Sequence, residues 1–221
     1  MSRRLRVVSL ILVAIVLLIA AGVLLAYRSS QYVPPFYRDA IAVDLAVQRH
    51  ANDQVLQQAT ALASDLQKRG HWAAVFTAEQ INGWLAVDLV ENYRDSLPPE
   101  IEAPRVDITS TAIILACRLH WGGVSSVVSL TVEPYMAGAN VLALRFRSAR
   151  AGRLPIPLRR GLDAIDAAAR DSNLQVKWRQ ADGDLVAMLS ILPPRDVRHK
   201  TVRLEMLRLE AGKIYVAGST E

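Results

Sequence analysis

The chain has 221 residues, of which 52% are hydrophobic, and its formal net charge is +5. Three of its 26 basic residues lie among the first six positions, which leaves 23 basic against 21 acidic residues in the rest of the chain. A balance this small argues against a general polyanion binder, so we expect no nucleic-acid partner. The single cysteine, Cys117, excludes an intrachain disulfide.

The first predicted element is an apolar helix. Residues 7–26 are twenty consecutive positions without a charge, and twenty helical residues rise about 30 Å, the hydrocarbon thickness of a bilayer. Three arginines precede this run, whereas only Arg28 follows it closely. The positive-inside rule therefore predicts a cytoplasmic tail over 1–6, a single transmembrane helix over 7–26 and a cell-membrane location, with the bulk of the chain extracytoplasmic. A cleaved secretory signal is the alternative, but its apolar region is usually about 7–15 residues long.

A stiff linker and a long helical segment come next. Residues 27–35 form the predicted linker, which ends in two prolines that fix the backbone dihedral φ. The following segment, 36–71, contains no proline, and its later apolar residues recur at helical spacing. We expect one long helix, or two helices with a break near 50–53, ending at Gly70, because glycine is favoured just beyond a helix C-terminus.

A shorter amphipathic helix is predicted over 76–89. Thr77 followed by Gln80 fits a capping box at its start. A helix that lies on a membrane surface normally carries basic residues on its polar face, whereas this one is acidic, so we interpret it as a wall packed against a sheet. Asn82 is interpreted as a structural hydrogen-bonding residue. The apolar face supplies a candidate groove wall: Ile81, Trp84, Leu85 and Leu89.

Beyond residue 99 the spacing of the apolar residues changes from the helical interval to every second residue. Four runs rich in Val, Ile, Leu and Thr are separated by short turn signals, which predicts an antiparallel meander. These runs cover 104–110, 111–121, 124–133 and 140–149. A helix over 160–171 is predicted to follow, and then two hairpins with turns at 182–183 and 211–212.

The order of these elements predicts an α+β fold. It consists of an N-terminal transmembrane helix, a long helix plus a short helix, and then a curved antiparallel sheet interrupted by one helix. We expect residues 72–221 to form one extracytoplasmic domain. Several strands are apolar on both faces, as in 112–117 and 185–191. In an antiparallel sheet with one solvent-exposed face, apolar and polar residues should alternate along each strand. These strands do not alternate, so either helices or an apolar ligand must cover the second face.

One stretch is strongly basic. Between Glu133 and Asp163 the chain has no acidic residue but six arginines. One interpretation is a solvated face without a specific role. The other is a surface that binds phosphate or carboxylate groups, such as those of anionic lipid headgroups or of an acidic partner. The candidate ligand or partner surface combines this cluster with a rigid proline-rich element: Arg145, Arg147, Arg150, Arg153, Leu154, Pro155 and Pro157.

The same region carries a family resemblance. The segment from Val128 to Pro134, the Gly138-x-Asn140 turn, the strand over 142–147 and the Gly-x-Leu-Pro-x-Pro element that ends at Pro157 resemble the YpmS-like family of small single-span membrane proteins. The resemblance implies a membrane-anchored α+β domain. A more distant similarity to tubular lipid-binding domains, which pair a long helix with a curved sheet, favours a lipid ligand.

Signatures of catalysis are absent from the sequence. The four histidines lack metal-ligand spacing, and neither a nucleophile elbow nor a phosphate-binding glycine loop occurs. We therefore predict no enzyme activity, no cofactor and no metal. The prediction is a membrane-anchored extracytoplasmic binding module for a lipid or another apolar ligand. The alternative is a non-enzymatic structural or assembly partner in a cell-envelope complex.

Overall fold

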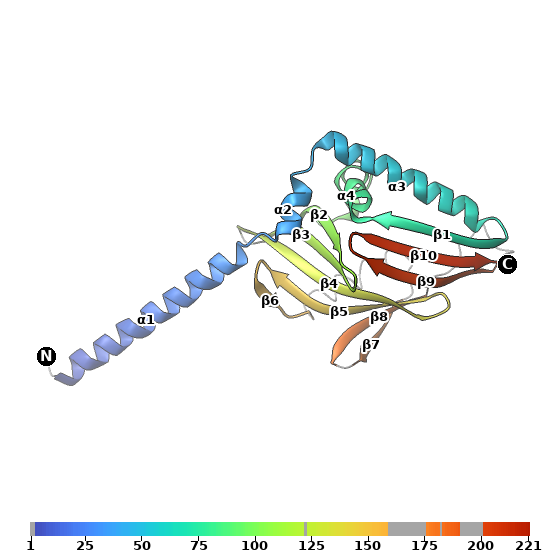
Figure 1. Cartoon of the computed structure of the whole chain (residues 1–221). Coiled ribbons are helices and arrows are strands. Elements are labelled where there is room, and N and C mark those ends of the chain that lie inside the picture. The colour runs from blue at the N-terminus through green and yellow to red at the C-terminus, as the bar shows by residue number, and fades with distance from the viewer. Residues whose placement is uncertain (1–2, 122, 159–175, 182, 191–200) are drawn as a thin grey trace.

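The computed structural model describes residues 3–121, 123–158, 176–181, 183–190 and 201–221 (Figure 1). Its helices are α1 (Arg3–Ser30), α2 (Pro35–Ile41), α3 (Leu45–Leu66), α4 (Ala78–Ala86), α5 (Asp88–Asn92) and the 3-10 turn η1 (Arg94–Ser96). Its strands are β1 (Gly70–Thr77), β2 (Ile101–Ile108), β3 (Ile113–Trp121), β4 (Val124–Gly138), β5 (Val141–Ala151), β6 (Leu154–Ile156), β7 (Val176–Ala181), β8 (Asp184–Ser190), β9 (Val202–Glu210) and β10 (Lys213–Thr220). The fold is α+β, with helices at the N-terminus and antiparallel strands after them, as predicted.

The strands divide between two sheets, so the prediction of one curved sheet was wrong. One sheet has three strands in the order β1-β10-β9, and the other runs β2-β3-β4-β5-β8-β7 with β6 paired to β5. The meander β2-β3-β4-β5 confirms the predicted antiparallel order. The helix expected over 160–171 lies outside the described residues.

The predicted helical segment 36–71 differs from the structure at its break and at its end. The chain breaks between α2 and α3, earlier than the predicted 50–53, because the Asp44 carboxylate accepts a hydrogen bond from the Ala46 N–H at 2.8 Å and starts a new helix. The helix ends at Leu66, and Gly70 opens strand β1. The sequence did not predict this strand because its partner is β10, at the opposite end of the chain.

Two helices cover different parts of the sheets (Figure 1). On one face of the meander, α2 places the fully buried Tyr37 against Ala116 and Val127. The Tyr37 hydroxyl donates to the Ala103 carbonyl at 2.9 Å, which fixes α2 on β2. Over the three-stranded sheet, Leu62 and Leu66 of α3 pack against a cluster centred on Trp72 and Val202. Helices thus cover one face of β3 and one face of the smaller sheet.

Helix α4 lies between α3 and strand β2, and local signals set its start. The Thr77 hydroxyl accepts from the Gln80 N–H at 3.1 Å, while the Gln80 side chain accepts from the Thr77 N–H at 2.9 Å. This reciprocal pair confirms the predicted capping box. The helix ends at Ala86 and α5 begins at Asp88, so the predicted helix 76–89 is two short helices.

Asn82 joins α4 to the outer edge of β2. Its side-chain amide donates to the Val106 carbonyl at 2.8 Å, and its side-chain oxygen accepts from the Val106 N–H at 2.7 Å. An edge strand leaves backbone N–H and C=O groups without a neighbouring strand to pair with. The Asn82 amide takes the place of that strand for the two backbone groups of Val106. The interpretation of Asn82 as a structural hydrogen-bonding residue is confirmed.

Replacing Asn82 by alanine is expected to destabilise the fold by about 2 kcal/mol, because it removes two hydrogen bonds and leaves buried Val106 backbone groups unpaired. Urea unfolding of the detergent-solubilised chain measures this loss. Asn92→Ala is the matched control, since that exposed amide donates to the Asp88 carboxylate on its own helix. Equal stability of the two variants would show that the contact with Val106 contributes nothing.

Helix α1 stands away from the folded body (Figure 1). From Ile15 to Leu25 its large apolar side chains are exposed, with Ile15 50%, Leu18 73% and Leu25 66% accessible. Within the described residues from Ile15 onward, no individual helix has the length and hydropathy of a complete membrane span. A bent pair, Ile15–Ser30 with Pro35–Ile41 at 47°, meets them by length and composition alone.

The last residues of α1 are bonded to the body. The Ser126 hydroxyl donates to the Ser30 carbonyl at 2.6 Å, and the Arg153 N–H donates to the Ser29 carbonyl at 2.9 Å. Gly152 has a φ of +58°, and a Cβ on it would collide with the Ser29 and Ser30 carbonyls. Glycine is required here both by the positive φ and by the close approach of α1.

Candidate functional site

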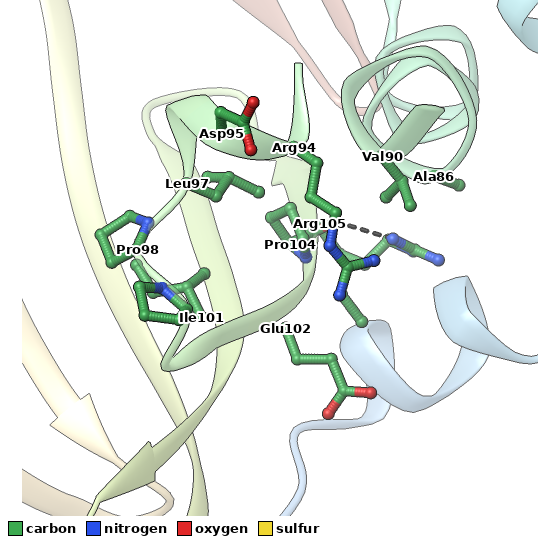
Figure 2. Close-up of a pocket in the computed structure, with 12 residues that line it drawn as sticks. Ala86, Val90, Arg94, Asp95, Leu97, Pro98, Ile101, Glu102, Pro104 and Arg105 are labelled. Atoms are coloured by element: carbon green, nitrogen blue, oxygen red, sulfur yellow. Dashed lines mark hydrogen bonds between the residues drawn. The ribbon is translucent and has the colours of Figure 1, made fainter. Parts of the chain in front are cut away.

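A pocket of about 630 Å³ lies between the short helices and the outer edge of β2 (Figure 2). Its volume falls within the range of small-molecule sites, about 300–1,000 Å³. Its wall is mostly apolar and contains two arginines and two carboxylates. The lining residues are Ala86, Val90, Arg94, Asp95, Leu97, Pro98, Pro99, Ile101, Glu102, Ala103, Pro104 and Arg105.

A bulge in β2 shapes one wall of the pocket. The pairing of β2 with β3 shifts between Glu102 and Arg105, so Ala103 and Pro104 have no partner in the register. Ala103 has a φ of +48°, a conformation that is uncommon for a residue other than glycine. Proline is tolerated at such a bulge because its missing N–H is not needed for strand pairing. Bulges redirect side chains, and here the residue that follows the bulge is Arg105.

Arg105 is a buried cation, with only 7% of its surface accessible. Its Nη1 donates to the Pro104 carbonyl at 2.7 Å, and its Nε donates to the Ala40 carbonyl at 3.4 Å. Among the described residues no carboxylate lies within ion-pair distance of it. Burial lowers the pKa of the guanidinium, and the nearby Tyr37 raises it. Two of its five N–H groups bond to backbone carbonyls, and the side chain also lines the pocket.

A second arginine approaches the pocket from the opposite wall. Arg94 belongs to η1, and Figure 2 shows its side chain extending from η1 toward Arg105, whose guanidinium is directed toward α2. Arg94 is exposed, and within the described part of the chain it forms no ion pair with a carboxylate. Two arginines from separate elements therefore line one pocket whose wall is mostly apolar.

The two acidic residues of the wall point elsewhere. Figure 2 shows the Glu102 carboxylate turned away from Arg105, and it bonds to the His120 imidazole at 2.8 Å. That hydrogen bond lowers the pKa of Glu102. Asp95 lies on the exposed turn η1. Both acidic residues are therefore exposed, whereas Arg105 is buried in the wall of the pocket.

The predicted groove wall occupies a neighbouring face of the same helices. Leu89 is buried, and Ile81, Trp84 and Leu85 are partly buried on α4. The Trp84 indole N–H donates to the Asp88 carboxylate at 2.9 Å. None of these four residues lines the pocket; instead the lining comes from Ala86, Val90 and Arg94. These three are spaced four residues apart, the helical interval that could have identified them.

The predicted arginine surface separates into two parts. Arg147 lies between two carboxylates, with Glu133 at 2.7 Å and Asp184 at 2.6 Å. Hydrogen bonding to Glu133, followed by the charges of both acids, raises the pKa of Arg147. Arg145 lies over the Tyr135 ring, 5.8 Å from its centroid. The positive charge of Arg147 is therefore already balanced by carboxylates of the sheet.

The other part of that surface lies beside the end of α1. The Arg153 guanidinium stacks 4.0 Å from the centre of the Tyr32 ring. Arg150 is exposed on β5 and pairs in register with Pro155 of β6. Leu154 is partly buried, whereas Pro155 and Pro157 are exposed. The structure thus brings the proline-rich element and two of the arginines to the junction with α1.

Metal and thiol chemistry find little support in the described residues. Within them, no group of three or more His, Cys, Asp or Glu side chains could hold a metal ion. Cys117 is partly buried, and burial raises the pKa of its thiol, which disfavours the nucleophilic thiolate.

Comparison of the chain with protein-family models, curated proteins and solved structures finds no match.

Proposed function

We propose that this protein is a single-pass, membrane-anchored module that binds a lipid or another apolar ligand outside the cytoplasm. The observation that carries the proposal is helix α1, whose large apolar side chains between Ile15 and Leu25 are 50% to 73% exposed. A helix that is apolar all around belongs in a hydrophobic environment. The uncharged run over 7–26 has the length of a bilayer span.

The junction supports this placement. Tyr27 is 54% exposed near the end of α1, and Arg28 follows it. Arg153 and Tyr32 stack beside them. Tyrosine is enriched at the membrane–water interface, and arginine side chains near the ends of a spanning helix extend toward the headgroups. The body would therefore rest with this junction at the headgroup level.

The pocket beside α2 supplies the binding function. Its volume and mostly apolar wall are typical of ligand sites. One of its lining residues, Arg105, bonds to Ala40 of α2, and α2 follows α1 after a linker of four residues, 31–34. A ligand that comes from the outer leaflet would meet this pocket near the membrane.

A reporter fusion tests the topology. β-Lactamase joined after Glu221 is expected to confer ampicillin resistance on a bacterial host, because the enzyme acts only outside the cytoplasm. Inverting the charge bias by changing Arg3, Arg4 and Arg6 to glutamate should reduce this resistance at equal expression. If the unmodified fusion conferred no resistance, that result would contradict the proposed orientation.

Native mass spectrometry of the full chain, released from mild detergent, tests the ligand. We expect a co-purified species whose mass matches a lipid, and we expect the variant Val90→Trp to reduce its occupancy by filling the pocket. Val90 is 39% exposed, so the larger side chain can be accommodated without loss of the fold. A lipid that is retained equally by both proteins would place it outside this pocket.

A second candidate function is that of an assembly partner in the cell envelope. The observation that favours it is a set of exposed apolar residues around the start of α3: Val43, Leu45 and Val47 are 41%, 52% and 57% accessible. Photocrosslinking from position 47 in whole cells should then capture one stoichiometric protein. Diffuse capture, or none, would count against this alternative.

A further inference from the structure

We propose that the pocket binds the anionic headgroup of a phospholipid, with Arg105 and Arg94 contacting its phosphate. This inference rests on the proposed binding function and names the class of ligand. Its central observation is Arg105, a residue with only 7% of its surface accessible and with no carboxylate partner among the described residues.

The charge arrangement selects an anion. A buried cation is unfavourable unless an opposite charge or hydrogen-bond acceptors accompany it. Backbone carbonyls satisfy two N–H groups of Arg105, and they carry no formal charge. The planar fork of arginine matches the oxygens of a phosphate, and Arg94 reaches the same space from η1. A phosphate placed between the two groups would compensate the buried charge.

The strand bulge provides the second, independent observation. The left-handed Ala103 and the unpaired Pro104 interrupt the edge of β2 immediately before Arg105. Such a backbone conformation carries a strain that tends to persist at ligand sites. The Tyr37 hydroxyl bonds to the Ala103 carbonyl and holds the bulge against α2. The bulge thus places a cation in the wall of the pocket at the edge of the sheet.

The wall of the pocket selects a lipid over a free phosphate ion. Val90, Leu97 and Ile101 offer apolar surface that a hydrated ion cannot use. An acyl chain gains from this surface by leaving water. Arg105 also bonds to Ala40 of α2, the helix that follows the proposed membrane anchor. A ligand with an anionic head and an apolar tail fits both features.

The test uses the full chain in a non-ionic detergent and measures binding by isothermal titration calorimetry. Three probes are compared: dihexanoyl phosphatidic acid, dihexanoyl phosphatidylcholine and inorganic phosphate. We expect the phosphatidic acid to bind at least tenfold more tightly than either of the others. Arg105→Gln should weaken its binding at least tenfold, and Arg94→Gln about threefold to tenfold because that side chain is exposed.

Two further variants separate charge from folding. Arg105→Lys keeps the charge but loses the fork, so its affinity should lie between those of the wild type and Arg105→Gln. Arg203→Gln is the matched control, because this exposed arginine lies on β9 in the other sheet. If Arg105→Gln does not fold, Arg94→Gln decides the result, since an unchanged affinity in that variant would overturn the role of the arginine pair.

The outcomes distinguish this inference from the proposed function. Equal binding of both phospholipids, unaffected by the arginine variants, would overturn the anionic headgroup but leave an apolar-ligand module intact. Inorganic phosphate that binds as tightly as the phosphatidic acid would overturn the lipid as the source of the anion. No binding of any probe, together with no co-purified lipid, would overturn both proposals.

Discussion

Changing Gly83 to alanine is expected to destabilise the protein by about 2 kcal/mol, and changing it to valine by about 3 kcal/mol or more. A Cβ at this position would lie 2.7 Å from the Ala51 Cβ, the Asn52 N and the Gln48 carbonyl oxygen of α3. Two of these atoms belong to the backbone, so neither a rotamer change nor a flexible side chain can relieve the contact. Helices α3 and α4 would have to separate.

The expected cost is a net value. Alanine is favoured over glycine in a helix by about 1 kcal/mol, which offsets part of the overpacking. Separation of the helices would also disturb Asn52, which is buried on α3. Urea unfolding in detergent gives the difference in the free energy of unfolding.

Gly138→Ala provides the control for the Gly83 series. It makes the same chemical change in the body, but the added Cβ would meet no atom within 4 Å. We expect its effect to stay within about 0.5 kcal/mol. If Gly83→Ala were equally mild, the contact between α3 and α4 would be looser than the structure shows.

The double variant Leu17→Asp with Leu18→Asp is expected to abolish stable membrane attachment. Leu17 and Leu18 lie near the middle of the uncharged run and are 64% and 73% exposed. On insertion scales an aspartate at the centre of a spanning helix costs about 3 kcal/mol, so two together cost roughly 6 kcal/mol. Membrane fractionation with alkaline carbonate should move the chain from the pellet to the supernatant.

Two controls separate the bilayer from a protein partner. Leu17→Ala with Leu18→Ala reduces side-chain volume but keeps the helix apolar, so the chain should remain in the pellet. Leu45→Asp with Val47→Asp adds the same charges to exposed positions on α3 and should also leave attachment unchanged. Loss of attachment in the alanine pair would indicate that α1 packs against another protein instead of lipid.

Features encoded by neighbouring residues were predictable from the sequence. The capping box depends on Thr77 and Gln80, three positions apart, and the meander depends on short turns between period-two runs. The break before α3 also had a local signal, the Asp44 cap, but the polar run at 50–53 was interpreted as the break instead. Asn52, inside that run, is buried in the structure.

Features that depend on distant residues were not predictable. Strand β1 exists because it pairs with β10. Arg147 was expected on a ligand surface, but Glu133 and Asp184 flank it only after the sheet has formed. The burial of Arg105 likewise requires the bulge in β2 and the carbonyl of Ala40 on α2. No residue pattern near Arg105 in the sequence predicts the pocket.

The contacts of Ser29 and Ser30 with the body have a mechanical consequence for the proposed anchor. Two hydrogen bonds from β4 and the β5–β6 turn hold the end of α1, and the Gln31 side chain adds a third by donating to the Ser125 carbonyl at 3.0 Å. The helix and the body should therefore tilt together. A spanning helix adjusts its tilt to the thickness of the bilayer. Bilayer thickness would then set the distance between the pocket and the lipid headgroups.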